Sequence, residues 1–157
     1  MENSNKMILL VEDNEDDVIF TLQALRDNNI GNEIVVARDG VEALDFLFGT
    51  GKYKDRDIYL LPQLVLLDIN LPKIDGLQVL EEIRGHVTTR LLPVIILTAS
   101  KEEKDMIKSY SLGANCFIRK PIDFKQFLDA VKQLSLYWLV LNEFPGYVPP
   151  SSDHWYS

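Results

Sequence analysis

Several predicted strands of this chain end in side chains that can bind a cation or a phosphoryl group. One apolar run leads directly into Glu12 and Asp13, and a second ends at Asp68. Two further runs end at Thr98 and Lys120. Carboxylates without neighbouring His or Cys favour Mg²⁺ or Ca²⁺ over zinc. A hydroxyl and an ammonium group suit phosphate oxygens. These residue types therefore predict a site for a hard cation and a phosphoryl group.

Magnesium is the ion that this donor set predicts. Asp13, Asp68 and a backbone carbonyl just after Asp68 would leave positions for water and a phosphate oxygen, the open coordination that Mg²⁺ favours. Glu12 lies at the same strand end and is a further predicted ligand. The next acids, at 15–17, fall in the first turn of a predicted helix, where negative charge complements the helix dipole. We therefore assign Glu12 and Asp13 to the cation and residues 15–17 to the helix.

Five β-then-α units must position these side chains. The predicted strands are apolar throughout rather than alternating, as expected for parallel strands buried on both faces. A succession of such units predicts an α/β fold with helices on both faces of an open parallel sheet. Ligands bind beyond the carboxyl ends of the strands in such a sheet. The predicted strands cover residues 7–11, 33–37, 64–68, 93–98 and 115–119.

Local signals mark helix starts and one long connector. Asp75 precedes Gln78 by three residues, which predicts a capping box, and Ser100 precedes Glu103 by the same spacing. Residues 49–62 are polar and lack a periodic pattern. We expect them to form a surface loop.

Four motifs, in order, resemble those of response-regulator receiver domains, the phosphoacceptor half of bacterial two-component signalling. They are LLVEDN at 9–14, LVLLDINLPKIDG at 64–76, VIILTAS at 94–100 and FIRKPID at 117–123. The similarity runs from about residue 6 to residue 136. It implies the flavodoxin-like receiver fold, a doubly wound five-stranded parallel sheet in the order 2-1-3-4-5.

The resemblance also implies a role for each acid and for the residue after the third strand. Asp68 would accept a phosphoryl group from a histidine of a sensor histidine kinase. Asp13 would bind Mg²⁺ directly, and Glu12 would hold it through water. Asn70 would supply its backbone carbonyl to the metal.

Residues of the fourth and fifth strands would bind and sense the phosphoryl group in the same comparison. Thr98 would hydrogen-bond a phosphoryl oxygen, Lys120 would pair with the group, and Pro121 would follow a cis peptide bond. Phosphorylation would draw Thr98 inward, and Phe117 matches the aromatic residue that then turns into the vacated space. Core packing is the alternative reading of Phe117. By the same resemblance, the kinase would dock around Val18, Leu22 and the loop at Ile122.

The C-terminal part predicts an extended helix and a tail. We assign residues 1–141 to the receiver domain with this helix and 142–157 to the tail. Residues 135–141, SLYWLVL, are apolar on more than one face, which predicts a homodimer through the helix; the alternative is a tail that folds back over its own domain. The stretch 106–127 together with the Tyr-Trp-Leu helix end is similar to phytochrome-associated single-domain response regulators. That similarity implies a light-sensing histidine kinase as phosphodonor. The short stretch after the receiver has neither basic charge nor a helix-turn-helix pattern, so we do not expect a transcription factor.

Composition excludes several classes of function. A net charge of −8 argues against nucleic acid and against an anionic membrane surface as partners. Neither a signal peptide nor a run of about 18 apolar residues is visible, so we expect a soluble, cytoplasmic protein. Cys116 is the single cysteine and lies between apolar neighbours, which predicts a buried structural thiol.

Three other functions are alternatives. A Mg²⁺-dependent phosphatase with Asp68 as nucleophile usually has a second acid two positions later, where this chain has Asn70. A flavodoxin-like cofactor binder needs a neutral first loop for phosphate, and the acids after Val11 would repel it. An adaptor that is never phosphorylated would have no need for the acids, Thr98 and Lys120 together. We therefore expect a phosphoacceptor that is not an enzyme.

Overall fold

Strands and helices alternate along the computed structural model, which describes residues 7–28 and 30–133. The strands are β1 (Ile8–Val11), β2 (Ile34–Ala37), β3 (Leu64–Leu67), β4 (Val94–Thr98) and β5 (Cys116–Arg119). The helices are α1 (Glu15–Asp27), α2 (Gly40–Phe48), the 3-10 helix η1 (Gly51–Tyr53), α3 (Gly76–Gly85), α4 (Glu103–Ser111) and α5 (Phe124–Gln133).

All five strands are parallel and lie in the order β2-β1-β3-β4-β5, which confirms the predicted fold. β1 is central to the site because it pairs with both β2 and β3, and Val11 lies level with Ala37 and Leu67. Every residue of β1, β3 and β4 is buried. Two covered faces explain why these strands are apolar throughout instead of alternating.

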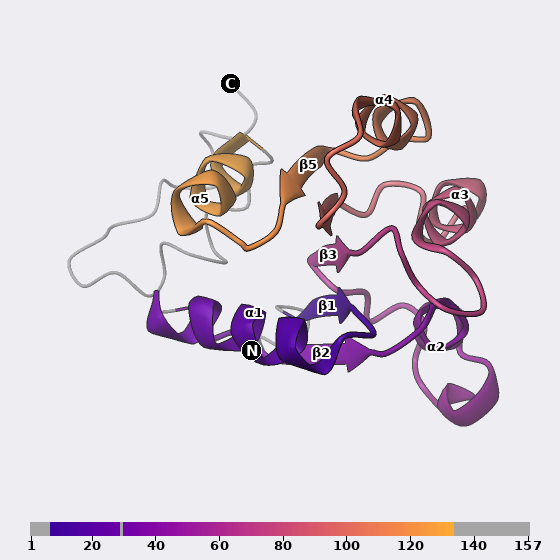
Figure 1. Ribbon diagram of the computed structural model, residues 1–157. Coiled ribbons are helices and arrows are strands. Elements are labelled where there is room, and N and C mark those ends of the chain that lie inside the picture. The colour runs from indigo at the N-terminus through magenta and orange to yellow at the C-terminus, as the bar shows by residue number, and fades with distance from the viewer. Residues whose placement is uncertain (1–6, 29, 134–157) are drawn as a thin grey trace, which may run out of the picture.

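Two hydrophobic cores cover the two faces of the sheet. α1 and α5 pack on one face, and α2 and α3 pack on the other, with α4 beside them (Figure 1). Successive residues of β1 point to opposite faces, so Leu9 belongs to the core under α2 and α3, and Leu10 to the core under α1 and α5. Val18 and Phe127 bring α1 and α5 onto that second core. Burying each such side chain stabilises the fold by about 1.5–3 kcal/mol.

The capping prediction was right for α3 and wrong for α4. Asp75 accepts from the Gln78 amide at 3.0 Å, and the Gln78 side chain accepts from the Asp75 amide at 3.2 Å. α4 instead begins at Glu103, and its N-cap is Glu102, whose side chain makes no capping hydrogen bond.

Ser100 does not cap α4 because its hydroxyl has another partner. The hydroxyl donates to Oδ2 of Asp105 at 2.6 Å and accepts from the Glu102 amide at 3.2 Å. Ser100 therefore holds the β4–α4 loop from a position two residues before Glu102, the N-cap of α4.

The connector between α2 and β3 is on the surface, as predicted, but it is ordered against α2. The guanidinium of Arg56 lies 3.9 Å from the ring centroid of Phe46, and its Nε donates to the Phe46 carbonyl at 2.6 Å. Its Nη1 donates to the Leu60 carbonyl at 3.0 Å. Arg56 thus ties the later part of the connector, through Leu60, to the helix that precedes it.

The described part of α5 ends at Gln133. The predicted extended helix, its dimer interface and the tail lie outside the described residues. Within the described part of the chain, no helix is long and apolar enough to cross a membrane. Cys116, predicted to be buried, is half-buried at the start of β5, and burial raises the pKa of its thiol.

Candidate functional site

Three carboxylates converge beyond the ends of β1 and β3. Glu12 and Asp13 follow β1, and Asp68 follows β3, its pairing neighbour. One oxygen from each lies within 4.8 Å of the others. Glu12 and Asp68 are buried, whereas Asp13 is exposed. The cluster is therefore open to solvent on the side of Asp13.

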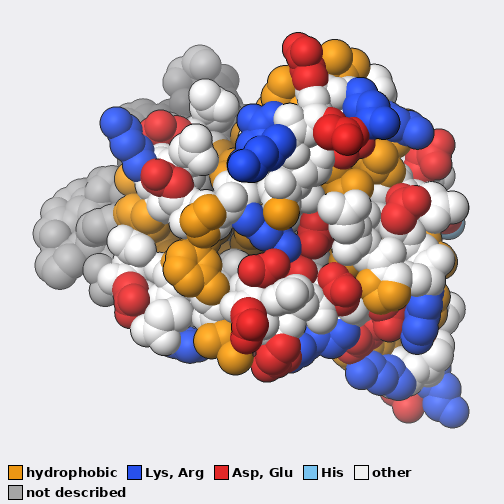
Figure 2. Space-filling model, viewed as in Figure 1, with side chains coloured by type: hydrophobic (Ala, Val, Ile, Leu, Met, Phe, Trp, Pro, Cys, Tyr) orange, Lys and Arg blue, Asp and Glu red, His pale blue; other side chains and the backbone are white. Residues whose placement is uncertain are grey.

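Lys120 brings a cation to this cluster from the end of β5. Its Nζ lies 2.9 Å from Oδ2 of Asp68 and 2.9 Å from Oδ2 of Asp17, and it also contacts a Glu12 oxygen. The Lys120–Pro121 peptide bond is cis, as the resemblance implied. Figure 2 shows acidic side chains gathered around a basic one in a hollow at the centre of this face.

The pKa values within the cluster follow from burial and from these contacts. Burial raises the pKa of Glu12, Asp68 raises it further, and the hydrogen bond from Lys120 opposes both without cancelling them. Burial by itself lowers the pKa of Lys120, but hydrogen bonds to the three carboxylates outweigh it and hold the pKa above the ordinary lysine value. Lys120 therefore pairs with three carboxylates at once, and one positive charge does not balance them.

The donor chemistry of the cluster fits a divalent magnesium-like ion. Glu12, Asp13 and Asp68 offer hard oxygen donors only, and the open side at Asp13 leaves room for water. Asn70 lies next to them, since its amide donates to Oδ1 of Asp68 at 3.2 Å. A divalent cation would offset the excess negative charge that Lys120 alone leaves.

Thr98 completes the arrangement at the end of β4. It is fully buried, and β4 lies between β3 and β5. Its Oγ1 accepts from the Ser100 amide at 3.3 Å. The hydroxyl is thus linked to the β4–α4 loop on the same edge of the sheet as Asp68.

A family model confirms what this edge of the sheet indicates. The model for the response regulator receiver domain matches residues 8–132, most of the chain. The chain belongs to the response-regulator receiver family.

This receiver is similar to several response regulators, including ones named for phytochromes. Response regulator Rcp1 of Synechocystis sp. is 39% identical over 144 residues, 92% of this chain and 96% of Rcp1. The bacteriophytochrome response regulator AtBRR is 45% identical, with a TM-score of 0.75 over 92% of this chain and 98% of its own.

Two solved structures show such relatives with a metal ion bound or in a phosphorylated form. Mn²⁺-bound Rcp1 is 36% identical, with a TM-score of 0.69 over 93% of this chain and 99% of that one. The phosphorylated cyanobacterial phytochrome response regulator RcpA is 38% identical, with a TM-score of 0.70 over 93% and 99%.

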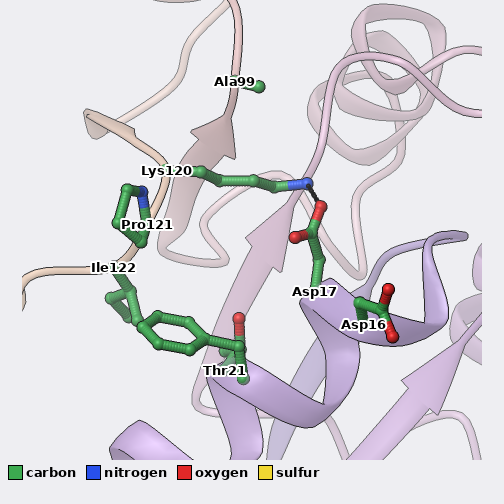
Figure 3. A pocket seen from close by; sticks show the side chains of 8 residues that line it. Asp16, Asp17, Thr21, Ala99, Lys120, Pro121 and Ile122 are labelled. Atoms are coloured by element: carbon green, nitrogen blue, oxygen red, sulfur yellow. Dashed lines mark hydrogen bonds and ion pairs between the residues drawn. The ribbon is translucent and has the colours of Figure 1, made fainter.

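A pocket of about 460 Å³ opens beside the acidic cluster of this receiver. Lys120 crosses it toward Asp17, with Pro121 and Ile122 on one side and α1 on the other (Figure 3). Its lining residues are Asp16, Asp17, Phe20, Thr21, Ala99, Lys120, Pro121 and Ile122.

Asp17 is a site residue that the sequence interpretation missed. The sequence pattern assigns Asp17 to the helix dipole alone, but its carboxylate also pairs with Lys120. The available signal was its position three residues after the N-cap Asn14, whose side chain accepts from the Asp17 amide at 2.9 Å. That capping contact fixes the first turn of α1, which carries Asp17.

The predicted kinase-docking residues of α1, Val18 and Leu22, lie on the face of the helix that packs against the core. Val18 is only 1% exposed, and Leu22 is half-buried against the same core. Ile19 and Phe20 are 53% and 49% exposed instead. Helical spacing identified the apolar stripe that packs inward, so it could not identify the docking face.

Phe117 lies between the core and solvent. It is half-buried and packs against the core under α2 and α3. The Arg119 guanidinium lies 5.8 Å from its ring centroid on the outer side. Both readings of Phe117, switch and core packing, are compatible with this placement.

Proposed function

We propose that this chain is a single-domain response regulator that accepts a phosphoryl group on Asp68 from a sensor histidine kinase. The reaction depends on Mg²⁺, and the protein signals by altered contacts with other proteins. The observation that carries the proposal is the convergence of Glu12, Asp13 and Asp68 with Lys120 at one edge of the sheet.

The transfer itself requires a positioned nucleophile and neutralised charge. A carboxylate oxygen of Asp68 attacks the phosphorus of a phosphohistidine; the new O–P bond forms as the P–N bond breaks, and the imidazole nitrogen keeps the electron pair. Lys120, already 2.9 Å from Asp68, pairs with a phosphoryl oxygen. The hydroxyl of Thr98 donates to another. Catalysis here is positioning and electrostatic stabilisation.

The cation would be held by this chain's own oxygen atoms. Asp13 and Asp68 would bind it directly, Glu12 would hold it through water, and Asn70 would contribute its backbone carbonyl. When bound, Mg²⁺ neutralises charge on the carboxylates and on the incoming phosphoryl group. The relative Rcp1 has been crystallised with Mn²⁺, an ion with similar ligand preferences, which supports this donor set.

The relatives also support the partners that we propose. AtBRR is a bacteriophytochrome response regulator, and RcpA is a phytochrome response regulator whose structure was solved in its phosphorylated form. We infer a phytochrome-type kinase as phosphodonor for this chain. Residues 1–141 would form the receiver with its extended helix, a homodimer would form through that helix, and 142–157 would be the tail.

Phosphorylation would be read out through Thr98 and Phe117. A phosphoryl group on Asp68 draws the Thr98 hydroxyl, and the β4–α4 loop follows because the Ser100 amide donates to that hydroxyl. Phe117, two strands from Asp68 and beside β4, turns inward as the loop moves. The change at the site thereby reaches the surface of α4 and β5.

Intact mass spectrometry after incubation with acetyl phosphate tests the function. Wild type should gain one phosphoryl group only with Mg²⁺, and Asp68→Ala should gain none. Asp55→Asn, an exposed acid on the connector, is the matched control and should behave as wild type.

Absence of an adduct in wild type has two explanations that a second probe separates. Beryllofluoride, a stable phosphoryl mimic, should still bind if the adduct merely hydrolyses too fast, and fluorine NMR would detect it. If neither adduct nor mimic is found, the phosphoacceptor function is wrong and an unphosphorylated adaptor takes its place.

A further inference from the structure

The loop between β3 and α3 rests directly on the backbone of α2. This loop, residues 69–75, follows Asp68 and contains Asn70. Its outer part meets Gly40, the first residue of α2: a Cβ added to Gly40 would lie 2.0 Å from the Ile74 carbonyl oxygen and 2.9 Å from the Ile74 Cβ. Real Cβ atoms do not approach closer than about 3.0 Å. Glycine is thus required at position 40 by a close backbone contact.

An ion pair holds the same part of the loop to the same end of α2. Nζ of Lys73 lies 3.2 Å from Oδ2 of Asp39, the N-cap residue of α2. Lys73 has a φ of 69° and is the one non-glycine residue with positive φ among the residues that the structure describes. A left-handed lysine is unfavourable by itself and persists where its surroundings hold it in place.

The inner end of the loop is also held in place, by a backbone hydrogen bond and by a close contact at Gly76. The Gly76 amide donates to the Ile69 carbonyl at 2.7 Å. A Cβ at Gly76 would lie 2.0 Å from the Asp68 carbonyl oxygen and 2.7 Å from the Ile69 Cα. These two contacts hold the base of the loop, so we expect a displacement of Ile74 to be taken up further along it. The intervening residues, which include Asn70, would then move.

We propose that Gly40 and the Asp39–Lys73 pair form an α2 clamp that positions the β3–α3 loop, and with it the Asn70 carbonyl, for the cation. None of the three residues belongs to the carboxylate cluster, so they are positioning residues. The inference rests on the metal-dependent function proposed above. It adds that the first turn of α2, on the far side of β1 from Lys120, determines how tightly the cation is bound.

The decisive variant is Gly40→Ala, with Gly85→Ala as its matched control. Alanine at position 40 has to move the Ile74 carbonyl by about 1 Å, whereas a Cβ at Gly85 has nothing within 4 Å. Direct Mn²⁺ binding, followed by the electron paramagnetic resonance signal of free Mn²⁺ with Mg²⁺ as competitor, gives the affinity without any phosphorylation. Changes to residues that orient metal ligands cost about 10-fold or more in metal affinity, and we expect Gly40→Ala to weaken binding by about 10-fold and Gly85→Ala to leave it unchanged.

Two substitutions of Lys73 keep the test informative if Gly40→Ala does not fold. Lys73→Ala removes the ion pair without creating a clash, and because the lysine side of the pair is exposed we expect a loss of only about two- to threefold in Mn²⁺ affinity. Lys73→Arg keeps the pair and should restore the affinity. Hydrogen exchange at the amides of residues 70–74 should be faster in Gly40→Ala and Lys73→Ala than in wild type.

The outcomes separate the clamp from the proposed function. Weakened Mn²⁺ binding with faster exchange in the loop, in a variant with a native circular dichroism spectrum, supports the clamp. Wild-type Mn²⁺ affinity in a folded Gly40→Ala, or in Lys73→Ala if the former does not fold, overturns it while the proposed function stands. If wild type itself binds no Mn²⁺, the proposed function and the clamp both fail.

Discussion

The ammonium group of Lys120 lies 2.9 Å from the carboxylate of Asp17, although the two residues are 103 positions apart in the chain. The same nitrogen contacts Glu12 and Asp68. Asp17 is the outermost of these acids, with 41% of its side chain exposed, against 2% for Glu12 and 7% for Asp68. Lys120 is thus held at the mouth of the site by one acid and paired inside it with two.

Removing Lys120 should cost far more stability than removing the charge of Asp17. Lys120→Met leaves two buried carboxylates without their cation, and breaking such a pair costs about 3 kcal/mol in the free energy of unfolding. Asp17→Asn breaks a partly exposed pair, worth less than about 1 kcal/mol. Urea denaturation without divalent ions measures both. Equal losses in the two variants would contradict the view that Lys120 mainly compensates buried acids.

Magnesium should stabilise the fold through the same cluster. An ion that binds only the folded state adds about 2.7 kcal/mol to the free energy of unfolding at 100 times its Kd. Asp13→Asn should lose most of this gain, and the exposed connector variant Asp55→Asn should keep it. Thermal denaturation with and without Mg²⁺ makes the comparison. Removal of Mg²⁺ with EDTA should return wild type to its lower midpoint.

Arg119 should restrain the β4–α4 loop, which we propose responds to phosphorylation. Its Nε donates to the Ser100 carbonyl at 3.1 Å and its Nη2 to the Lys101 carbonyl at 3.3 Å. Arg119→Ala should therefore speed hydrogen exchange at residues 100–102 in the unphosphorylated protein. Lys125→Ala, an exposed change on α5, is the control. Unchanged exchange in Arg119→Ala would mean that Thr98 and Ser100 hold the loop without Arg119.

The exposed face of α1 should matter for the kinase and not for a small phosphodonor. Phe20 lines the pocket beside Lys120 and is 49% exposed. Phe20→Ser should slow phosphoryl transfer from a phosphorylated histidine kinase by about 10-fold or more, as for loss of a central interface aromatic. It should leave phosphorylation by acetyl phosphate unchanged. Ile107→Ser, at a 59% exposed position on α4, should affect neither reaction.

Acid should weaken the cap of α2. Burial alone raises the pKa of Asp39, but hydrogen bonds from the Glu42 amide and Lys73 lower it by more, so the net pKa is below the ordinary value. A lowered folded-state pKa adds stability above the unfolded-state pKa of about 3.9, and this stability is lost as the pH falls through the folded value.

Comparison with Asp39→Asn isolates that charge, because asparagine caps helices as well as aspartate does. The advantage of wild type over Asp39→Asn in urea denaturation should be constant above about pH 5 and shrink toward pH 3. Asp39→Ala should lose about 1 kcal/mol more, since it also removes the cap. An advantage that stayed flat down to pH 3 would show that the carboxylate charge is not involved.

Much of the fold and of the site could be predicted from the sequence because both depend on where strands end. Uninterrupted apolar runs such as Leu64–Leu67 occur where a strand is buried on both faces, so β3 was located to within one residue. In a parallel sheet all carboxyl ends lie at one edge. That rule alone predicts that Asp13, Asp68 and Lys120 lie at one edge, and the structure confirms that Asp13 and Lys120 both lie close to Asp68.

Only the tertiary structure decided how each helix is rotated about its axis and which side chains it contacts after packing. The sequence showed an apolar stripe on α1, but packing determined that Val18 faces the core, that Phe20 faces outward and that Asp17 reaches Lys120. The contact of Gly40 with Ile74 joins residues 34 positions apart and leaves no local pattern. Periodicity reports which side of an element is apolar, whereas a specific pair forms only when two elements meet at one distance and one angle.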